Sequence, residues 1–149
     1  MVLAAHDPSL AWLVPPEVVA PIRACLREMP GLLGLGYRRM EGPFWLRRLR
    51  RQAERSLPGG VLHMATRKAW IEREVRRAIA GGATQVVVIG AGFDSLAYRL
   101  HRERGDVAWW EVDRPATQRV KLAGLDRAGA PSPTLGFVAA DLGRSRSPT

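Results

Sequence analysis

A short turn with two glycines limits the folds open to this chain more than any other feature of its sequence. Residues 85–89 form a continuous, mostly β-branched run, typical of a strand buried on both faces of a sheet. Gly90 and Gly92 follow it directly, and the pattern of residues 94–104 indicates a helix. Glycine permits a sharp turn and lets the backbone approach a ligand closely. A strand, a glycine turn and a helix in this order predict a ligand-binding corner of an α/β fold.

The same alternation of helix and strand runs through the second half of the chain. Residues 66–80 place apolar side chains at the helical period, before the first strand. Two further strand-like runs occupy residues 107–112 and 134–139, and a helix predicted from Pro115 to about residue 126 separates them. This order predicts crossover connections and a parallel sheet, which places the chain in the α/β class.

The first sixty residues have a different character. They hold seven of the eleven prolines and no strand-like run. Residues 16–29 indicate a short helix that Pro21 would kink, and the glycine-rich stretch 31–42 indicates a loop. Residues 44–56 indicate an amphipathic helix with arginines on its outer faces. The sequence therefore predicts a helical segment in front of the α/β part.

Composition excludes several classes of protein. The chain has 149 residues, of which 46% are hydrophobic and 25% charged, so neither pervasive disorder nor a disulfide scaffold fits. Cys25 is the lone cysteine and is expected to be a buried thiol, and the scattered histidines indicate no metal site. Only Lys68 and Lys121 among the 23 basic residues are lysines, a skew typical of a GC-rich genome. Without a long apolar run or a signal pattern, we expect a cytoplasmic protein with no membrane partner.

Acidic residues follow the predicted strands at one edge of the sheet. Glu111 and Asp113 stand 19 and 21 residues beyond Gly92, the spacing at which an acidic side chain takes ribose hydroxyls. Asp113 is favoured over Glu111 because it stands at the strand's carboxyl end, and Asp141 follows the third strand at the same edge. Three acids after three consecutive segments predict a binding site for a ribose-containing ligand.

The glycine turn itself fits two classes of ligand, dinucleotides and S-adenosylmethionine. The dinucleotide pattern requires glycine or alanine where this chain has Ser95. A carboxylate at Asp94, at the start of a helix, would repel a pyrophosphate but tolerate the sulfonium and ammonium groups of S-adenosylmethionine. The same carboxylate could instead only complement the helix dipole. The sequence thus favours S-adenosylmethionine, with a purely structural turn as the alternative.

Taken together, these segments resemble the leucine carboxyl methyltransferase family. The similarity covers about residues 62–142, and its most specific parts are the Gly-Ala-Gly-Phe-Asp-Ser loop beginning at Gly90 and the Glu-Val-Asp-Arg-Pro segment beginning at Glu111. It implies a Rossmann-like class I methyltransferase fold with S-adenosyl-L-methionine as cofactor. Members of the family methylate carboxyl groups or other oxygens, and some belong to polyketide pathways.

The resemblance also implies a role for each matched position. Arg67 would pair with the methionine carboxylate through its guanidinium fork, and Asp113 would bind the ribose. Asp141 and Leu142 would flank the adenine. The expected cofactor-binding residues are Arg67, Gly90, Ala91, Gly92, Asp94, Glu111, Asp113, Asp141 and Leu142.

The chain departs from the family in extent, since family members are longer and have more strands than this sequence supplies. We therefore expect a fold truncated after the third parallel strand. Residues 1–60 would form a helical lid over the substrate, residues 61–142 a partial cofactor-binding domain, and residues 143–149 a disordered polar tail.

The expected function is that of an O-methyltransferase acting on a small-molecule acceptor of the carboxyl or polyketide type. A carboxylate needs no general base, whereas a phenol needs one, and neither His63 nor His101 is assigned that role. A methyltransferase remnant without activity is the main alternative. A nucleic-acid binder built on the arginines of residues 47–55 and a dinucleotide oxidoreductase are weaker ones, and no specific nucleic-acid partner is expected.

Overall fold

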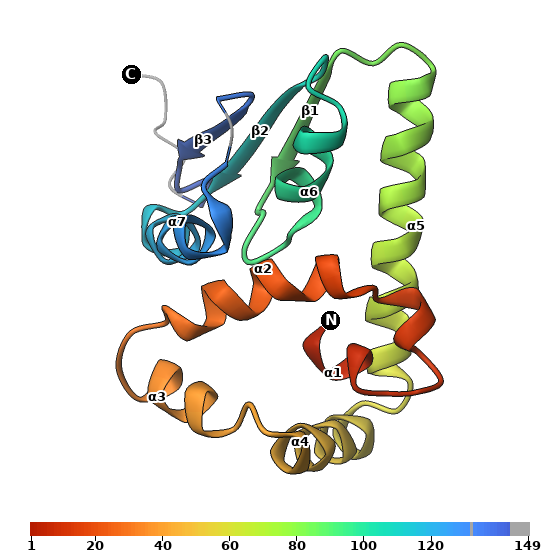
Figure 1. Ribbon diagram of the computed structural model, residues 1–149, viewed down its shortest axis with the longest axis vertical. Coiled ribbons are helices and arrows are strands. Elements are labelled where there is room, and N and C mark those ends of the chain that lie inside the picture. Colours follow the sequence, from red (N-terminus) through yellow and green to blue (C-terminus); the bar gives the residue numbers. More distant parts are fainter. Residues whose placement is uncertain (132, 144–149) are drawn as a thin grey trace.

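A parallel three-stranded sheet forms the centre of the second half of the molecule (Figure 1). The computed structural model describes residues 1–131 and 133–143, so residues 144–149 of the expected tail lie outside the described part. The strands are β1 (Gln85–Ile89), β2 (Ala108–Asp113) and β3 (Leu135–Ala139). They pair in the order β1-β2-β3, with Val87 opposite Trp110 and Trp110 opposite Gly136. The parallel α/β architecture is therefore confirmed.

Three helices connect and support these strands. Helix α5 (Gly60–Ala80) leads into β1, α6 (Leu96–Glu103) joins β1 to β2, and α7 (Pro115–Gly129) joins β2 to β3. Their apolar side chains meet the inward-facing side chains of the sheet in one core, with Trp109 fully buried at its centre. Helix α5 starts earlier than predicted because the positive φ of Gly59, +73°, lets the chain turn directly into the helix.

One face of the sheet differs from the prediction. Residues 85–89 were expected to be buried on both faces, yet only Val86 and Val88 pack against the core. Val87 and Ile89, on the opposite face, are 48% and 68% exposed. Successive side chains of a strand point to opposite faces, and nothing in the described part of the chain covers this second face.

The first sixty residues are helical, as predicted, and pack around a second apolar core. Helix α2 includes Pro21 in its interior without ending there. On α4, Phe44 and Trp45 are exposed, and Leu46 takes the buried position. The elements are α1 (Val2–Ala5), a 3-10 turn (Ala11–Leu13), α2 (Pro16–Arg27), α3 (Gly31–Arg39) and α4 (Pro43–Ser56).

The prediction of a loop over residues 31–42 is wrong, because α3 occupies most of this stretch. Three glycines in nine residues weaken helix propensity, but packing against α2 overrides this local preference. Gly34 is buried against the backbone of Met29, where a Cβ would stand only 1.8 Å from the carbonyl oxygen. The glycine that suggested a loop therefore permits a close contact at the start of this helix.

Helices α2 and α7 join the two halves of the chain through a close contact. A Cβ added at Gly124 would lie 2.5 Å from the Cα of Cys25, so glycine is the residue that lets the helices approach this closely. Cys25 is a buried free thiol, as expected, and burial raises its pKa to about 11. The helical segment is thus packed directly against the α/β part.

Gly124→Ala is expected to lower the free energy of unfolding by about 2 kcal/mol, because the added methyl group must displace backbone atoms of α2. Urea unfolding followed by circular dichroism measures the change. Gly36→Ala is the matched control, since a Cβ there meets only the end of the Met40 side chain at 3.5 Å. The free energy of unfolding of that control should rise by about 0.5–1 kcal/mol, because alanine has the higher helix propensity. Equal changes at the two positions would contradict the packing argument.

Candidate functional site

The glycine turn after β1 has a backbone that favours glycine. Gly90 and Gly92 have φ values of +66° and +52°, which side chains rarely adopt. A Cβ at Gly90 would meet no atom of the described residues within 4 Å, so among these residues the space above the turn is open. Ala91 between them is buried. The turn therefore exposes backbone at the carboxyl end of the strand, where ligands of α/β sheets bind.

Asp113 connects this turn to the neighbouring strands. The backbone N–H of Gly92 donates a hydrogen bond to one oxygen of its carboxylate, and the N–H of Arg114 donates to the other at 2.6 Å. Its own carbonyl accepts from the N–H of Ala140 at 2.8 Å. The structure thus brings together the predicted turn, the end of β2 and the segment after β3 at a single edge.

Asp141 and Leu142 lie at this edge and are exposed. The Asp141 carboxylate is 3.7 Å from the guanidinium of Arg114 and accepts a hydrogen bond from the N–H of Gly143 at 3.1 Å. These contacts hold the carboxylate beside the end of β2 and leave Leu142 available to a ligand.

Asp94 has partners that its sequence pattern does not indicate. Its carboxylate accepts the N–H of Leu96 at 3.1 Å and pairs with the Lys68 ammonium, while Lys121 donates to its backbone carbonyl at 2.6 Å. Helix α6 therefore begins two residues later than predicted, behind this capped turn. The two lysines of the chain thus converge on one residue of the loop. Their rarity among so many arginines is the signal that could have identified them.

The pairing with Lys68 changes the interpretation of Asp94. A carboxylate that caps a helix and is balanced by an ammonium group corresponds to the structural alternative considered for this position. Its repulsion of a pyrophosphate is correspondingly weaker. Among the acids at this edge, Asp113 is partly exposed and forms no ion pair within the described residues. A dinucleotide is therefore disfavoured mainly by Ser95, because an acid placed as Asp113 is can bind the ribose of either class of ligand.

Glu111 lies beneath the site rather than on its surface. It is 1% exposed, and its carboxylate is 2.5 Å from the ammonium of Lys121, which is equally buried. Burial raises the pKa of the Glu111 carboxyl, and the charge of Lys121 opposes this rise. Since the same ammonium holds the carbonyl of Asp94, the buried pair supports the loop from below.

Arg67 stands on α5, next in sequence to the lysine that pairs with Asp94. It is exposed, and within the described residues its guanidinium has no ion pair. It is therefore available to an anionic group near the loop. Of the two histidines considered as bases, His63 is exposed on α5, and His101 is buried in α6, where its Nδ1 lies 3.1 Å from the carbonyl oxygen of Ala97.

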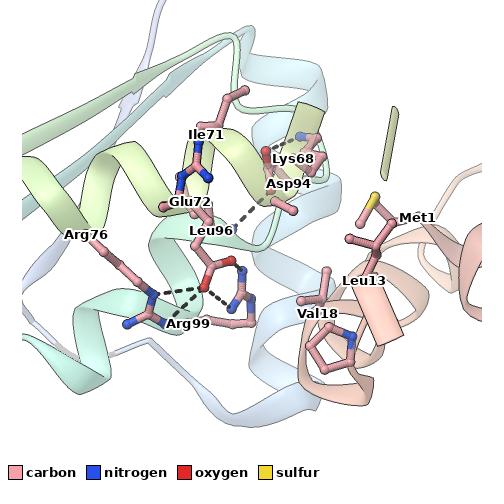
Figure 2. Close-up of a pocket in the computed structure, with 13 residues that line it drawn as sticks. Met1, Leu13, Val18, Lys68, Ile71, Glu72, Arg76, Asp94, Leu96 and Arg99 are labelled. Atoms are coloured by element: carbon pink, nitrogen blue, oxygen red, sulfur yellow. Dashed lines mark hydrogen bonds and ion pairs between the residues drawn. The ribbon is translucent and has the colours of Figure 1, made fainter. Parts of the chain in front are cut away.

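A cavity of about 340 Å³ borders the same loop (Figure 2). Asp94 and Lys68 form part of its wall, and the first eighteen residues of the chain supply apolar side chains. Glu72 lines it as well and pairs with Arg99 and Arg76. Burial opposes ionisation of Glu72, but these two guanidinium groups keep its pKa below the usual value. The apolar lining residues are Met1, Leu13, Pro15, Val18, Ala69, Ile71 and Leu96.

Two kinds of feature are absent from residues 1–131 and 133–143. No cluster of three or more side chains suited to a metal ion occurs in these ranges. No helix there is long and apolar enough to cross a membrane.

Comparison with known proteins agrees with this geometry. The family model described as leucine carboxyl methyltransferase matches residues 3–149. A protein of Mycolicibacterium gilvum is 38% identical over 93 residues, which is 62% of this chain and 36% of the relative. One of Mycobacterium bovis is 40% identical over 70 residues, covering 47% of this chain and 23% of the relative. Both are provisionally named S-adenosyl-L-methionine-dependent methyltransferases, and the matched part spans about a third of their length or less.

Proposed function

The chain belongs to the leucine carboxyl methyltransferase family, and from this we propose that it binds S-adenosyl-L-methionine and methylates a small carboxylic acid. One observation carries the proposal: the glycine turn is tied through the Gly92 N–H to the carboxylate of Asp113, at the carboxyl edge of a parallel sheet. The names of the relatives support the same cofactor.

The residues at the edge fit the parts of this cofactor. The exposed guanidinium of Arg67 suits the methionine carboxylate, and the space above Gly90 would admit the part of the cofactor that carries the sulfonium. The partly exposed carboxylate of Asp113 suits the ribose hydroxyls. Asp141 and Leu142 would then flank the adenine. An acidic edge also suits a ligand with two cationic groups.

The cavity beside Asp94 is the proposed binding site of the methyl acceptor. Its apolar walls would hold the body of an organic acid. Four basic side chains line the cavity against two acids, so a net positive charge remains for a carboxylate although several of the basic groups are in ion pairs. Residues 1–60 would act as the lid, because Met1, Leu13 and Val18 come from them, and residues 61–142 would hold the cofactor.

The composition of this cavity favours a carboxyl acceptor over a phenol of the polyketide type. The described residues that line it include no histidine, and its two acids, Asp94 and Glu72, are both held in ion pairs. A carboxylate is ionised at neutral pH and needs no base, whereas a phenol does. When bound, the cofactor supplies a methyl group that leaves the sulfonium for a carboxylate oxygen, and sulfur keeps the electron pair. The protein then has to position the two groups and exclude water.

Transfer of a radiolabelled methyl group to a panel of apolar carboxylic acids and phenols tests this proposal. We expect a labelled product that releases methanol in mild alkali, as a methyl ester does and an aryl ether does not. A base-stable product would overturn the carboxyl assignment. If the chain binds the cofactor but labels none of the acceptors, the inactive alternative would be favoured.

A further inference from the structure

We propose that α3 and α4 form a surface that binds anionic phospholipid membranes peripherally. This inference is independent of the methyl-transfer proposal. It concerns the end of the molecule away from the sheet, where Figure 1 shows these two helices. The expectation of no membrane partner rested on the lack of a spanning segment, and a peripheral contact needs none.

The first observation is an unpaired row of positive charge. Arg47, Arg51 and Arg55 recur every four residues on α4, so they project from one side of the helix, and Arg48 adjoins them. All four are exposed, and no carboxylate of the described residues pairs with them. Arg50 differs, since it pairs with Asp7 at 3.0 Å. Four guanidinium groups without counter-charge fit a polyanionic surface.

The second observation is a set of exposed apolar side chains on the same two helices. Phe44 lines the same groove as the four arginines and is 63% exposed. Leu32 and Leu33, at the start of α3, are 86% and 73% exposed. Trp45 is exposed as well, although Leu46 next to it is fully buried against the helical core.

Charge and apolar exposure together indicate a membrane surface rather than a nucleic acid. A nucleic acid would need the arginines but would leave exposed leucines in water. A lipid bilayer offers phosphate and carboxylate groups at its surface and hydrocarbon just beneath it, and basic amphipathic helices with Trp, Phe and Leu insert in this way. Phe44 lies in the groove that the four arginines line, so both kinds of side chain occur together on α4.

Co-sedimentation of the full chain with vesicles tests the proposal, comparing phosphatidylcholine alone with phosphatidylcholine containing about 30% phosphatidylserine. Each arginine near such a surface should contribute about fivefold to partitioning, so the triple variant Arg47→Gln/Arg51→Gln/Arg55→Gln should bind about a hundredfold more weakly. The matched control removes the same charge from exposed positions on α5 and α7, by Arg77→Gln/Arg119→Gln/Arg127→Gln. We expect the control variant to lose far less affinity for the anionic vesicles.

The double variant Leu32→Ser/Leu33→Ser tests the contribution of the exposed apolar side chains to vesicle binding and leaves the net charge unchanged. This variant should also lose binding to anionic vesicles. Brominated lipid should quench the fluorescence of the full chain, and Trp45→Phe should remove most of that quenching. Equal binding to neutral and anionic vesicles, or equal losses in the two triple variants, would overturn the proposal. Binding to an oligonucleotide but not to vesicles would overturn it in favour of a nucleic-acid surface.

Discussion

Replacing Lys121 with methionine is expected to lower the free energy of unfolding by about 3–5 kcal/mol. The substitution conserves most of the side-chain volume but leaves Glu111, which is 1% exposed, without its counter-charge. It also removes the donor to the Asp94 carbonyl. Urea unfolding at pH 7 measures the loss, with circular dichroism to confirm that the variant starts folded.

The double variant Lys121→Met/Glu111→Leu separates the buried charge from the contact itself. Replacing both members of a buried ion pair with apolar residues is often neutral, so most of the lost stability should return. A double variant as unstable as the single one would contradict this account. It would show that the contact with Asp94, rather than the unpaired carboxylate, dominates.

The dependence on pH gives a second check on Glu111. Burial raises its pKa above the ordinary value of 4.5, so the folded chain binds this proton more tightly than the unfolded chain does. Its contribution to stability is therefore fully present below pH 4.5 and is lost as the pH rises through the raised pKa. Without Lys121 the pKa rises further. The deficit of Lys121→Met should thus be largest near neutral pH and shrink as the pH falls.

Asp113→Ala is expected to weaken binding of S-adenosylhomocysteine, the demethylated cofactor, by about 1.5–3 kcal/mol, or roughly 10- to 150-fold. The carboxylate would bind the ribose, and it also holds the N–H groups of Gly92 and Arg114. Loss of the ribose contact and loss of these backbone hydrogen bonds should both weaken binding. Calorimetric titration measures the change.

Asp106→Ala serves as the control for Asp113, because it removes the same charge from an exposed acid that contacts Arg104 away from the loop. Asp106→Ala should bind S-adenosylhomocysteine with the same affinity as the unchanged chain. An unchanged affinity in Asp113→Ala would remove Asp113 from the proposed site, and equal losses in both variants would indicate a general charge effect.

Features with a short sequence period could be predicted from the sequence. The strands, the helices that connect them and the position of the glycine turn follow from hydrophobic periodicity and glycine placement within a few residues. Asp113 and Asp141 could also be placed at one edge, because parallel strands end on the same side. Contacts between residues that are far apart in the sequence could not be predicted in this way. The pairing of Lys68 with Asp94 joins residues 26 apart, and no local pattern marks it.

Packing explains the remaining differences. Helix α3 forms despite its glycines because Gly34 fits against Met29, a contact that propensity does not show. The exposure of Val87 and Ile89 depends on what covers the sheet, whereas their β-branched run only indicates a strand. Spacing fits both Glu111 and Asp113, and the position at the strand end favours Asp113, but only the structure shows that Glu111 is buried in an ion pair with Lys121.

Calorimetric titration of the purified chain with S-adenosylhomocysteine tests the central claim, that the carboxyl edge of the sheet binds S-adenosylmethionine. We expect saturable one-to-one binding with a micromolar Kd, and no comparable heat from a nicotinamide dinucleotide. Ser95 stands where the dinucleotide pattern requires glycine or alanine, so the turn should favour the first ligand over the dinucleotide. No binding by a chain that is folded by circular dichroism, or tighter binding of the dinucleotide, would contradict the account.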